Sequence, residues 1–576
     1  MHNQSSKTKF VHPKKEQVKK LVDLYQSGQT SKTERLCKKL LKSFPKSLLV
    51  NNILGATLVS QKKYKNALQA YNKAIQLKPD YAEAYFNRGV TLQALEEFQK
   101  SINSYNQAIK LRPDYMQAFN NRGLAFQELK NFDGAIDSYN QAIKFKSDYF
   151  EAYYNRGVAF QALGEFDKAV NSYNQAIKLR SDYVQAFNNR GLAFQGLGEF
   201  DKAVNSYNQA IKLNPNYVEA YYNCGITLED LGKINDSIKS YAKAIKIKHD
   251  YAEPHWNLSL LLLLNGDLKN GWEEYEYGKL TEKKDRRLAK APYKIWNSES
   301  LKGKDILITA EQGIGDEIMF SSCIPEIINQ NPNSVIVECD SRIATLLERS
   351  FKPIKTLNRK DRDKENWIKN IGNIDFQISI GSLPKFFRQS TGNFPLKKSF
   401  LLPNQSLQKK WKDRYNALGS GLKVGISWRG GNNDKLRSIN LNLWKDIFQS
   451  KAHFINLQYG DYSQEVEQLK LDQSVHLHNW DDVNPLIEID NFIAQISALD
   501  LVISVDNSTV HFAGAVGVPV WVLLPASPNY RWMQTRKDSP WYPTMKLYRQ
   551  NHHDNWNDIF IDISKELNKL VKLHCS

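Results

Sequence analysis

Charged and hydroxyl side chains follow several apolar runs in the C-terminal half of the sequence. Asp316 lies in EQGIGDEIMF, just after the run DILITA, where a helix is expected to begin. A carboxylate at this position can cap the helix N-terminus, or it can act as a general base that takes a proton from an acceptor hydroxyl. The residue type and its spacing leave both interpretations open.

The segment DNSTVH follows the run DLVISV and leads into another expected helix. Its candidate donor-binding residues are Asp506, Ser508, Thr509 and His511. Hydroxyl groups and free backbone N–H groups at a helix N-terminus can hold a phosphate, so this turn can bind the diphosphate of a nucleotide donor. Plain helix capping, with the histidine buried in the helix, is the alternative.

Two arginines follow the run KVGISW. Arg429 precedes a pair of glycines, and Arg437 lies eight residues further along. A guanidinium group presents paired, planar donors that suit a phosphate group. Each arginine can equally be a surface cation. The expected strand ends place both on the side where two α/β halves would meet, which favours the anion-binding interpretation.

Short apolar runs alternate with amphipathic stretches in this half of the chain, the pattern of a parallel α/β sheet. One block contains DILITA, SVIVEC and DFQISI, and a second contains KVGISW, HFINLQ, DLVISV and PVWVLL. Ligands bind at the carboxyl ends of such strands. We therefore predict a GT-B fold, with Rossmann-like halves at residues 303–400 (acceptor side) and 423–576 (donor side) and a linker at 401–422.

A 34-residue period dominates the N-terminal half, as in tetratricopeptide (TPR) helix–turn–helix repeats. Close copies of one segment begin at Tyr81, Tyr115, Tyr149, Tyr183 and Tyr217, with weaker copies at Ser47 and Tyr251. Such helix pairs bury their apolar faces only by stacking on their neighbours. We predict an α + α/β multidomain protein with an all-α TPR superhelix at residues 14–284, about seven repeats plus a cap. A disordered segment (1–13) precedes it, and a joint (285–302) follows.

One asparagine recurs at the same position of the repeats: Asn87, Asn121, Asn155, Asn189, Asn223 and Asn257. Asparagine is somewhat over half a kcal/mol worse than alanine inside a helix, so its recurrence calls for a reason. In TPR proteins the first helix lines the concave face, and this row resembles the asparagine ladder of the O-GlcNAc transferases. The pattern predicts a groove that hydrogen-bonds a protein or an extended peptide. Duplication of one tolerated asparagine is the alternative.

The composition indicates a soluble protein of several domains, with 576 residues, 41% of them apolar and 24% charged. The net charge of +18 comes from scattered lysines, which we interpret as solvated helix faces rather than as a nucleic-acid-binding surface. The five cysteines form no CxxC pair, and neither a signal peptide nor a membrane-spanning run is visible. We expect a cytoplasmic protein.

The quoted motifs resemble a known family. GIGDEIMFSS, VGISWRGG with RSINL, and LDLVISVDNSTVHFAGAVGVPVWVLLP with SPWYPTMKLYRQ look like the heptosyltransferase-like glycosyltransferases (family 9), and most like a branch fused to TPR repeats. The resemblance covers about residues 290–550. It implies that Asp316 is the catalytic base, that Arg437 contacts a phosphate and that residues 506–511 bind the donor. It also implies an inverting transferase that uses a nucleotide-sugar and needs neither a metal nor a cofactor.

Two functional hypotheses follow. The first is a glycosyltransferase that moves a sugar from a nucleotide-sugar to a hydroxyl of a protein or glycan, with the TPR array binding the acceptor or a partner protein. The second is a non-catalytic TPR adaptor that carries a degenerate transferase domain. A nucleic-acid-binding scaffold rests on the net charge alone.

Overall fold

The computed structural model describes residues 13–278, 280–281, 292–361, 371–431, 437–460, 462–470, 475–480, 482–551 and 555–575. Residues 1–12 of the predicted disordered segment and 285–291 of the predicted joint lie outside these described residues. The chain divides into two compact units, residues 1–237 and residues 238–576. We call them the helical unit and the C-terminal unit, and each is described by itself.

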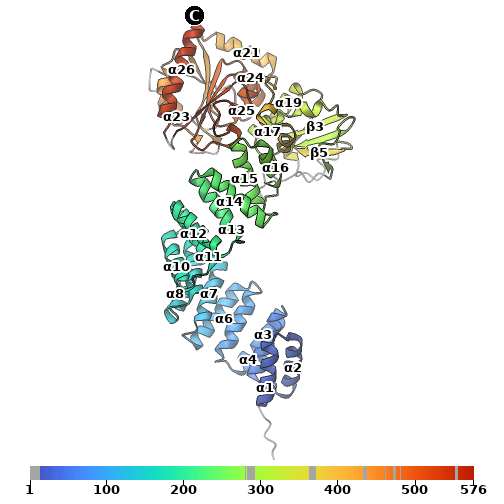
Figure 1. Ribbon diagram of the computed structural model, residues 1–576, viewed down its shortest axis with the longest axis vertical. Coiled ribbons are helices and arrows are strands. Elements are labelled where there is room, and N and C mark those ends of the chain that lie inside the picture. The colour runs from blue at the N-terminus through green and yellow to red at the C-terminus, as the bar shows by residue number, and fades with distance from the viewer. Residues whose placement is uncertain are drawn as a thin grey trace, which may run out of the picture. The chain divides into compact units, whose positions relative to one another are not determined.

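The helical unit is a stack of antiparallel helix pairs (Figure 1). Its helices are α1 (Lys15–Gln26), α2 (Thr30–Ser43), α3 (Leu48–Ser60), α4 (Tyr64–Leu77), α5 (Ala82–Gln93), α6 (Phe98–Leu111), α7 (Met116–Glu128), α8 (Phe132–Phe145), α9 (Phe150–Ala162), α10 (Phe166–Leu179), α11 (Val184–Gly196), α12 (Phe200–Leu213) and α13 (Val218–Asp230). The predicted all-helical TPR array is confirmed.

The repeats between residues 48 and 213 are held together by a glycine that faces a buried tyrosine. In the repeat of α7 and α8, a Cβ atom added to Gly123 would lie 2.5 Å from the ring of Tyr139. That tyrosine is fully buried, and its hydroxyl donates to Gln127 on the first helix. The same contact recurs at Gly89, Gly157 and Gly191. Any larger residue at these positions would push the two helices apart.

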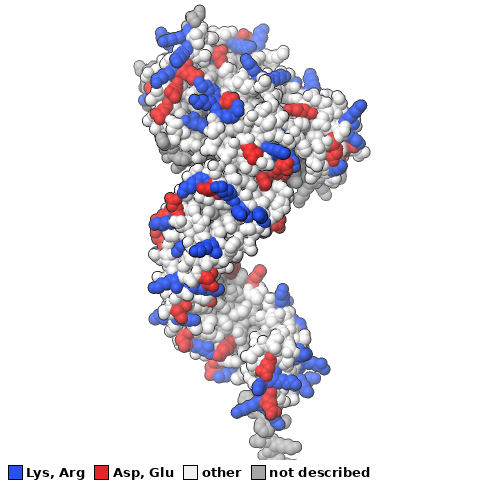
Figure 2. All heavy atoms as spheres, viewed as in Figure 1, with Lys and Arg blue, Asp and Glu red and all other residues white. Residues whose placement is uncertain are grey.

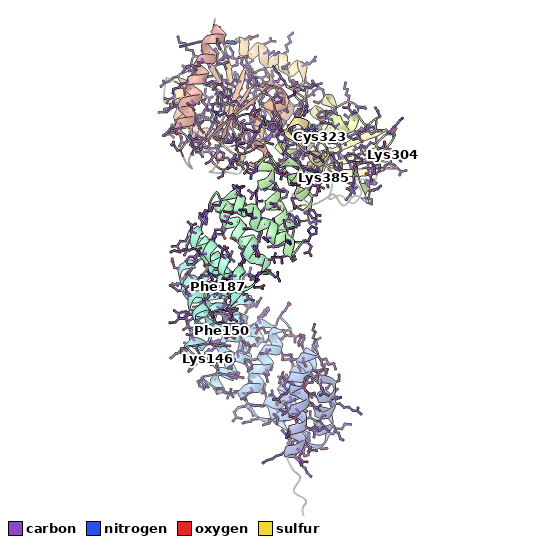
Figure 3. All side chains as sticks on the ribbon, in the orientation of Figure 1. Lys146, Phe150, Phe187, Lys304, Cys323 and Lys385 are labelled. Carbon is purple, nitrogen blue, oxygen red and sulfur yellow. The ribbon has the colours of Figure 1, made fainter. Side chains whose placement is uncertain are left out.

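Neighbouring repeats are joined by side chains as well as by their apolar faces. Phe150, labelled in Figure 3, packs edge-on against Tyr183 of the next repeat, with ring centroids 5.4 Å apart. Arg156 on the first helix of its repeat donates to Asn140 of the preceding repeat at 2.9 Å and to Ser172 of its own repeat at 3.2 Å. Equivalent arginines lie at positions 88, 122 and 190.

Basic and acidic side chains are interspersed on the face shown in Figure 2. Several lysines of the repeats pair with a glutamate at the start of the same helix, as Lys168 does with Glu165 and Lys202 with Glu199. This arrangement agrees with the interpretation of the basic excess as solvated helix faces. Among the described residues, no helix is long and apolar enough to cross a membrane.

The C-terminal unit contains two parallel sheets. The first has the strands β1 (Lys294–Ile295), β2 (Asp305–Thr309), β3 (Ser334–Cys339), β4 (Lys355–Asn358) and β5 (Phe376–Ser379). The second has β6 (Lys423–Ser427), β7 (His453–Asn456), β8 (Leu477–His478), β9 (Leu501–Val505), β10 (Val520–Leu524) and β11 (Met545–Arg549). Their central strands are fully buried and strongly apolar, as parallel strands covered on both faces must be.

The helices of this unit flank the sheets (Figure 1). They are α15 (Ala252–Leu264), α16 (Leu268–Gly278), α17 (Ile314–Ser321), α18 (Ile324–Ile328), α19 (Ala344–Ser350), α20 (Leu383–Phe387), α21 (Gln405–Asn416), α22 (Lys445–Phe448), α23 (Ser463–Lys470), α24 (Ile489–Ser497), α25 (Ser508–Ala515) and α26 (Asn557–Cys575). The helix α14 (Ile234–Ile247) crosses the boundary between the two units.

The strand order marks where ligands bind. The second sheet has the order β11-β10-β9-β6-β7-β8, which is the order of a doubly wound Rossmann sheet. The first sheet has the order β1-β5-β2-β3-β4. In each sheet the order reverses beside its first long strand, between β2 and β5 and between β6 and β9. A crevice opens at the carboxyl ends of the strands at such a switch point, and ligands bind there.

Two predicted connections hold regular structure. The predicted linker contains α21, which Asn404 caps and which buries Trp411 against α24, where the indole donates to Asn491 at 2.8 Å. The predicted joint contains β1, which pairs in parallel with β5. Both segments are rich in charged residues and have few apolar ones. The sequence therefore shows no clear helical or strand periodicity there.

Candidate functional site

The predicted general base lies where the two sheets meet. Asp316 is in the first turn of α17, which follows β2, and its side chain is 13% exposed. The neighbouring Gly315 faces His511 of α25, and a Cβ atom at this glycine would lie 3.0 Å from the imidazole ring. The structure therefore brings the end of β2 in the first sheet next to the helix that follows β9 in the second.

Asp316 is paired with Arg531. The guanidinium donates to the Oδ1 atom of Asp316 from Nε at 2.8 Å and also from Nη2. Arg531 belongs to a short helical turn, Tyr530–Trp532, that follows β10, so the pair joins the two sheets. Burial disfavours the charge of Arg531, but Asp316, Tyr530 and Asp506 outweigh burial and raise its pKa.

A second carboxylate, Asp506, interacts electrostatically with Arg531. Asp506 is fully buried directly after β9, and burial raises its pKa while Arg531 and Arg437 oppose that rise. The Nη1 atom of Arg437 is 3.9 Å from its Oδ2 atom. Asp506 thus helps to balance the cations of the site, and it is too deeply buried to be the group that first meets a ligand.

His511 is neutral at physiological pH. The side chain is buried, it stacks on Trp532, and its Nδ1 atom is 3.0 Å from the hydroxyl of Tyr542. Burial, with a smaller contribution from the positive charge of Arg531, lowers its pKa to about 3. An uncharged imidazole can orient neighbours by hydrogen bonding but supplies no positive charge for a phosphate.

The turn before α25 combines a helix cap with one accessible hydroxyl. Asn507 is the N-cap and accepts from the backbone N–H of Thr509 at 3.0 Å, so the capping interpretation holds for this residue. Ser508 is half-buried, and its hydroxyl donates to the hydroxyl of Tyr459 at 3.2 Å. Thr509 is fully buried, and its hydroxyl has no hydrogen-bond partner among the described residues.

Arg429 lies at the end of β6, as predicted, but its charge is already paired. Its guanidinium donates to Glu465 of α23 at 2.8 Å, and its backbone N–H donates to Gln458. Arg437 packs beside the backbone of Gly430 and remains about one-third exposed. Of the two predicted phosphate contacts, Arg437 is nearer to the carboxylates of the site.

A hollow of about 530 Å³ lies next to Ser508, at the carboxyl ends of β7 and β8. It is lined by Tyr459, Tyr462, Trp480, Val483, Asn484 and Leu486. Its size is typical of a small-molecule site, and aromatic and aliphatic walls with one amide suit a planar heteroaromatic ring. On its rim, Arg342 of the first sheet donates to the carbonyl of Leu486 at 2.6 Å, so both sheets contribute to this region.

The asparagine ladder has defined hydrogen bonds. All six ladder asparagines are half-buried on the first helix of their repeats. Asn87, Asn155 and Asn223 each donate at 3.0 Å to an asparagine of the preceding repeat. Asn189 donates instead to Tyr154 at 3.0 Å, and Asn257, in the C-terminal unit, donates to Tyr241 at 3.2 Å. A primary amide has two N–H donors and a carbonyl oxygen, so each side chain keeps further capacity for a ligand.

These partners alternate from one repeat to the next. Within the helical unit, the position just before the ladder position is an asparagine in every second repeat and an aromatic residue in the others. The asparagines are Asn52, Asn120 and Asn188, and the aromatic residues are Phe86, Tyr154 and Tyr222. The helical unit therefore has a true period of two repeats, or 68 residues. The sequence shows this alternation, but the 34-residue period masks it.

Sequence reasoning missed two groups at the site. Arg531 lies among aromatic residues in the sequence, and nothing local indicates its partner, which lies 215 residues away. Tyr275 of α16 was assigned to the repeats, yet its hydroxyl donates to Glu311 of the first sheet at 2.7 Å. An arginine within a buried aromatic cluster is a usable signal, since such a charge needs a buried partner.

Comparison with known families identifies the repeats. Residues 55–96, 94–130, 128–164, 160–198, 197–232 and 228–266 each match the family model of the TPR repeat. Protein FlbA of Caulobacter vibrioides is 30% identical over 310 residues, which cover 51% of this chain and 52% of that protein. The chain thus spans about half the length of this curated relative.

Solved structures give matches of limited extent. A crystal structure of MamA is 25% identical and covers 29% of this chain and 92% of its own, with a TM-score of 0.28. YrrB, described as a TPR protein with an unusual peptide-binding site, is 21% identical and covers 32% of this chain and 95% of its own, with a TM-score of 0.29. The family matches identify the repeats of residues 55–266 as TPR repeats.

Proposed function

We propose that the C-terminal unit is a GT-B glycosyltransferase that moves a sugar from a nucleotide-sugar to an acceptor hydroxyl, and that the TPR repeats bind a protein acceptor or partner. The observation that carries this proposal is the convergence of side chains from both sheets. Asp316 comes from the first sheet, and Arg531, His511 and Ser508 follow strands of the second. All lie at carboxyl ends of parallel strands, where such folds bind ligands.

In this proposal the donor lies along the second sheet. Its base occupies the hollow lined by Tyr459 and Trp480, and its diphosphate lies at the N-terminus of α25, near Ser508 and Arg437. Backbone N–H groups and a guanidinium would stabilise the negative charge that develops on the leaving diphosphate. Asp316 would then take the proton of the acceptor hydroxyl as that oxygen attacks the anomeric carbon.

The ion pair with Arg531 favours a second candidate. Arg531 occupies the Oδ1 atom of Asp316, and a buried ion pair can be purely structural. If the pair never opens, the C-terminal unit has no transferase activity and the protein is a TPR adaptor. For transfer, the donor phosphates would have to draw Arg531 away from Asp316.

Nucleotide binding and turnover separate the two candidates. The full chain is screened by thermal shift against nucleoside diphosphates and nucleotide-sugars, and release of the nucleoside diphosphate from the best donor is then measured. We expect Asp316→Asn to lower turnover by roughly 10²–10⁴-fold while the nucleotide-induced shift persists.

Asp375→Asn is the matched control. Asp375 pairs with Lys304 at 2.9 Å and accepts from the backbone N–H of Asp305, at the amino ends of β2 and β5, and Lys304 is labelled in Figure 3. This variant also loses a carboxylate from an ion pair, but at the opposite end of the sheet. Normal turnover in Asp316→Asn would reject its role as base, and a wild-type chain with neither shift nor turnover would leave only the adaptor.

A further inference from the structure

The last helix pair of repeat type, α15 and α16 of the C-terminal unit, contacts the candidate site. The indole N–H of Trp272, on α16, donates to the carbonyl of Arg388 at 3.2 Å. The centroid of the same ring lies 6.1–6.3 Å from the ring centroids of Phe320, Tyr530 and Trp541. The backbone of α15 accepts a hydrogen bond at Leu264 from Gln534, just after the turn that carries Arg531. Helices of repeat type thus pack against both sheets.

Tyr275 carries this contact into the site. Its side chain is fully buried, and its hydroxyl donates to Glu311, directly after β2, at 2.7 Å. The same hydroxyl accepts from the side-chain amide of Gln312. Space here is tight, because a Cβ atom added to Gly381 would lie 3.1 Å from the hydroxyl and 2.6 Å from the Glu311 carboxylate.

Gln312 connects Tyr275 with the ion pair of the site. Its Oε1 atom accepts from Arg531 at 3.4 Å, and its carbonyl accepts from Arg359 at 2.9 Å. The backbone of Gln312 is left-handed, with φ of +62°, a conformation that is strained for a residue other than glycine. The bonds to Tyr275, Arg531 and Arg359 offset this strain.

We propose that Tyr275 is a positioning residue of the active site, which acts through Gln312 to fix the Arg531–Asp316 pair. This inference rests on the proposed transferase function. On this proposal, the helix pair α15 and α16 contributes a positioning residue to the site and does not only end the array. A displacement of about 1 Å at a reacting group can cost about a hundredfold in rate, so a loosened Gln312 is expected to be felt in catalysis.

The first test is Tyr275→Phe in the full chain, which removes one oxygen and keeps the buried ring. We expect kcat to fall about ten- to a hundredfold with little change in the KM for the donor. Tyr277→Phe is the control, since Tyr277 lies on the same helix, is 38% exposed and stacks on His255.

Gln312→Gly is the second variant. Glycine adopts the left-handed conformation without strain, which offsets the loss of the side-chain bonds. Thermal stability is therefore expected to stay close to that of the wild type, while turnover falls as in Tyr275→Phe. A merely structural residue would lower stability and activity together. Wild-type kcat and KM in both variants would overturn the proposal.

A double-mutant cycle separates this inference from the proposed function. Tyr275→Phe and Arg531→Lys are combined, and the thermal midpoints of the four proteins are compared. Non-additive losses support the link through Gln312 even if the wild type transfers no sugar, in which case only the transferase proposal fails. Additive losses overturn the link, whatever the activity.

Discussion

At the scale of single residues, the sequence predicts which side chains lie at the ends of strands but not where those side chains point. Asp316, Asp506 and Ser508 were selected because they follow apolar runs, and each lies at the carboxyl end of a buried strand. Arg531 was not selected as a site residue, because nothing local to its segment reveals a partner two hundred residues earlier. Thr509 was predicted to bind the donor, but its side chain is fully buried, since the helix turns its hydroxyl inwards. Strand ends can be predicted, whereas the rotation of a side chain depends on packing.

His511 should make the unfolding free energy of the C-terminal unit depend on pH. Its pKa of about 3 in the folded state lies below the ordinary value of 6.5, because burial disfavours the charged ring. The unfolded chain therefore binds a proton that the folded chain does not. The free energy of unfolding is therefore highest above about pH 6.5 and falls as the pH is lowered towards 3. The slope of this fall is up to about 1.4 kcal/mol per pH unit.

The prediction is checked with urea unfolding of the wild type and His511→Gln between pH 4 and pH 8. Other titrating groups are common to both proteins, so the difference between the two curves isolates the histidine. The wild-type advantage should shrink below about pH 6.5. Parallel curves across this range would contradict the burial argument.

At the scale of elements, long periodic features were predicted and short irregular ones were not. The helices of the array follow from a 34-residue period with glycine and tyrosine at fixed positions. Helix α21 fell within a predicted linker, because only Trp411 and Tyr415 are buried in a segment rich in lysine. Strand β4 carries no apolar run, since it lies at the edge of its sheet and is half-exposed.

The glycine–tyrosine contact inside each repeat gives a prediction with a definite sign. Alanine is better than glycine within a helix by about 1 kcal/mol, so Gly123→Ala would stabilise an isolated helix. In the repeat, however, the new methyl group would lie 2.5 Å from the ring of Tyr139, which is fully buried. Overpacking costs about 1–3 kcal/mol, so we expect a lower thermal midpoint for the helical unit, followed by circular dichroism.

Gly392→Ala is the comparison for this variant. Gly392 lies in the C-terminal unit, and its added methyl group meets only the Ser390 hydroxyl, at an ordinary 3.8 Å. The thermal midpoint of the helical unit should therefore stay that of the wild type. A stabilised Gly123→Ala protein would mean that the helices of the repeat separate more easily than their packing implies.

At the scale of the whole molecule, we expect partner binding in the TPR repeats and nucleotide binding in the C-terminal unit. The ladder asparagines belong to the repeats, whereas the candidate site is built within the C-terminal unit. Partner binding and nucleotide binding should therefore respond to different variants. The two-sheet organisation was predicted because apolar runs of five or six residues alternate with helices, and the fusion to repeats was visible in the period itself.

Replacing Asn121, Asn155 and Asn189 by alanine should weaken binding of an extended peptide about a hundredfold, at about 1 kcal/mol for each lost hydrogen bond. The probe is the best peptide from an array of overlapping sequences, measured by fluorescence anisotropy. The nucleotide-induced thermal shift should stay unchanged.

The triple variant Asn106, Asn140 and Asn174 to alanine is the control for the ladder. These asparagines have the same 34-residue spacing and also bond to a neighbouring repeat, but they lie on the second helix and accept from arginines. Equal loss of peptide binding in the two triple variants would point to weakened stacking rather than to a groove.

The alternation of the ladder partners has a consequence for the length of the array. Helices α10 and α12 have the same fourteen-residue sequence, and α7 and α11 differ in only two residues. Excising residues 149–216 would place Tyr217 where Tyr149 stood, and every interface would still join the same two kinds of surface. Excising a single repeat would instead set two amide-bearing surfaces, or two aromatic ones, side by side. The array can therefore be shortened or extended cleanly only in steps of two repeats.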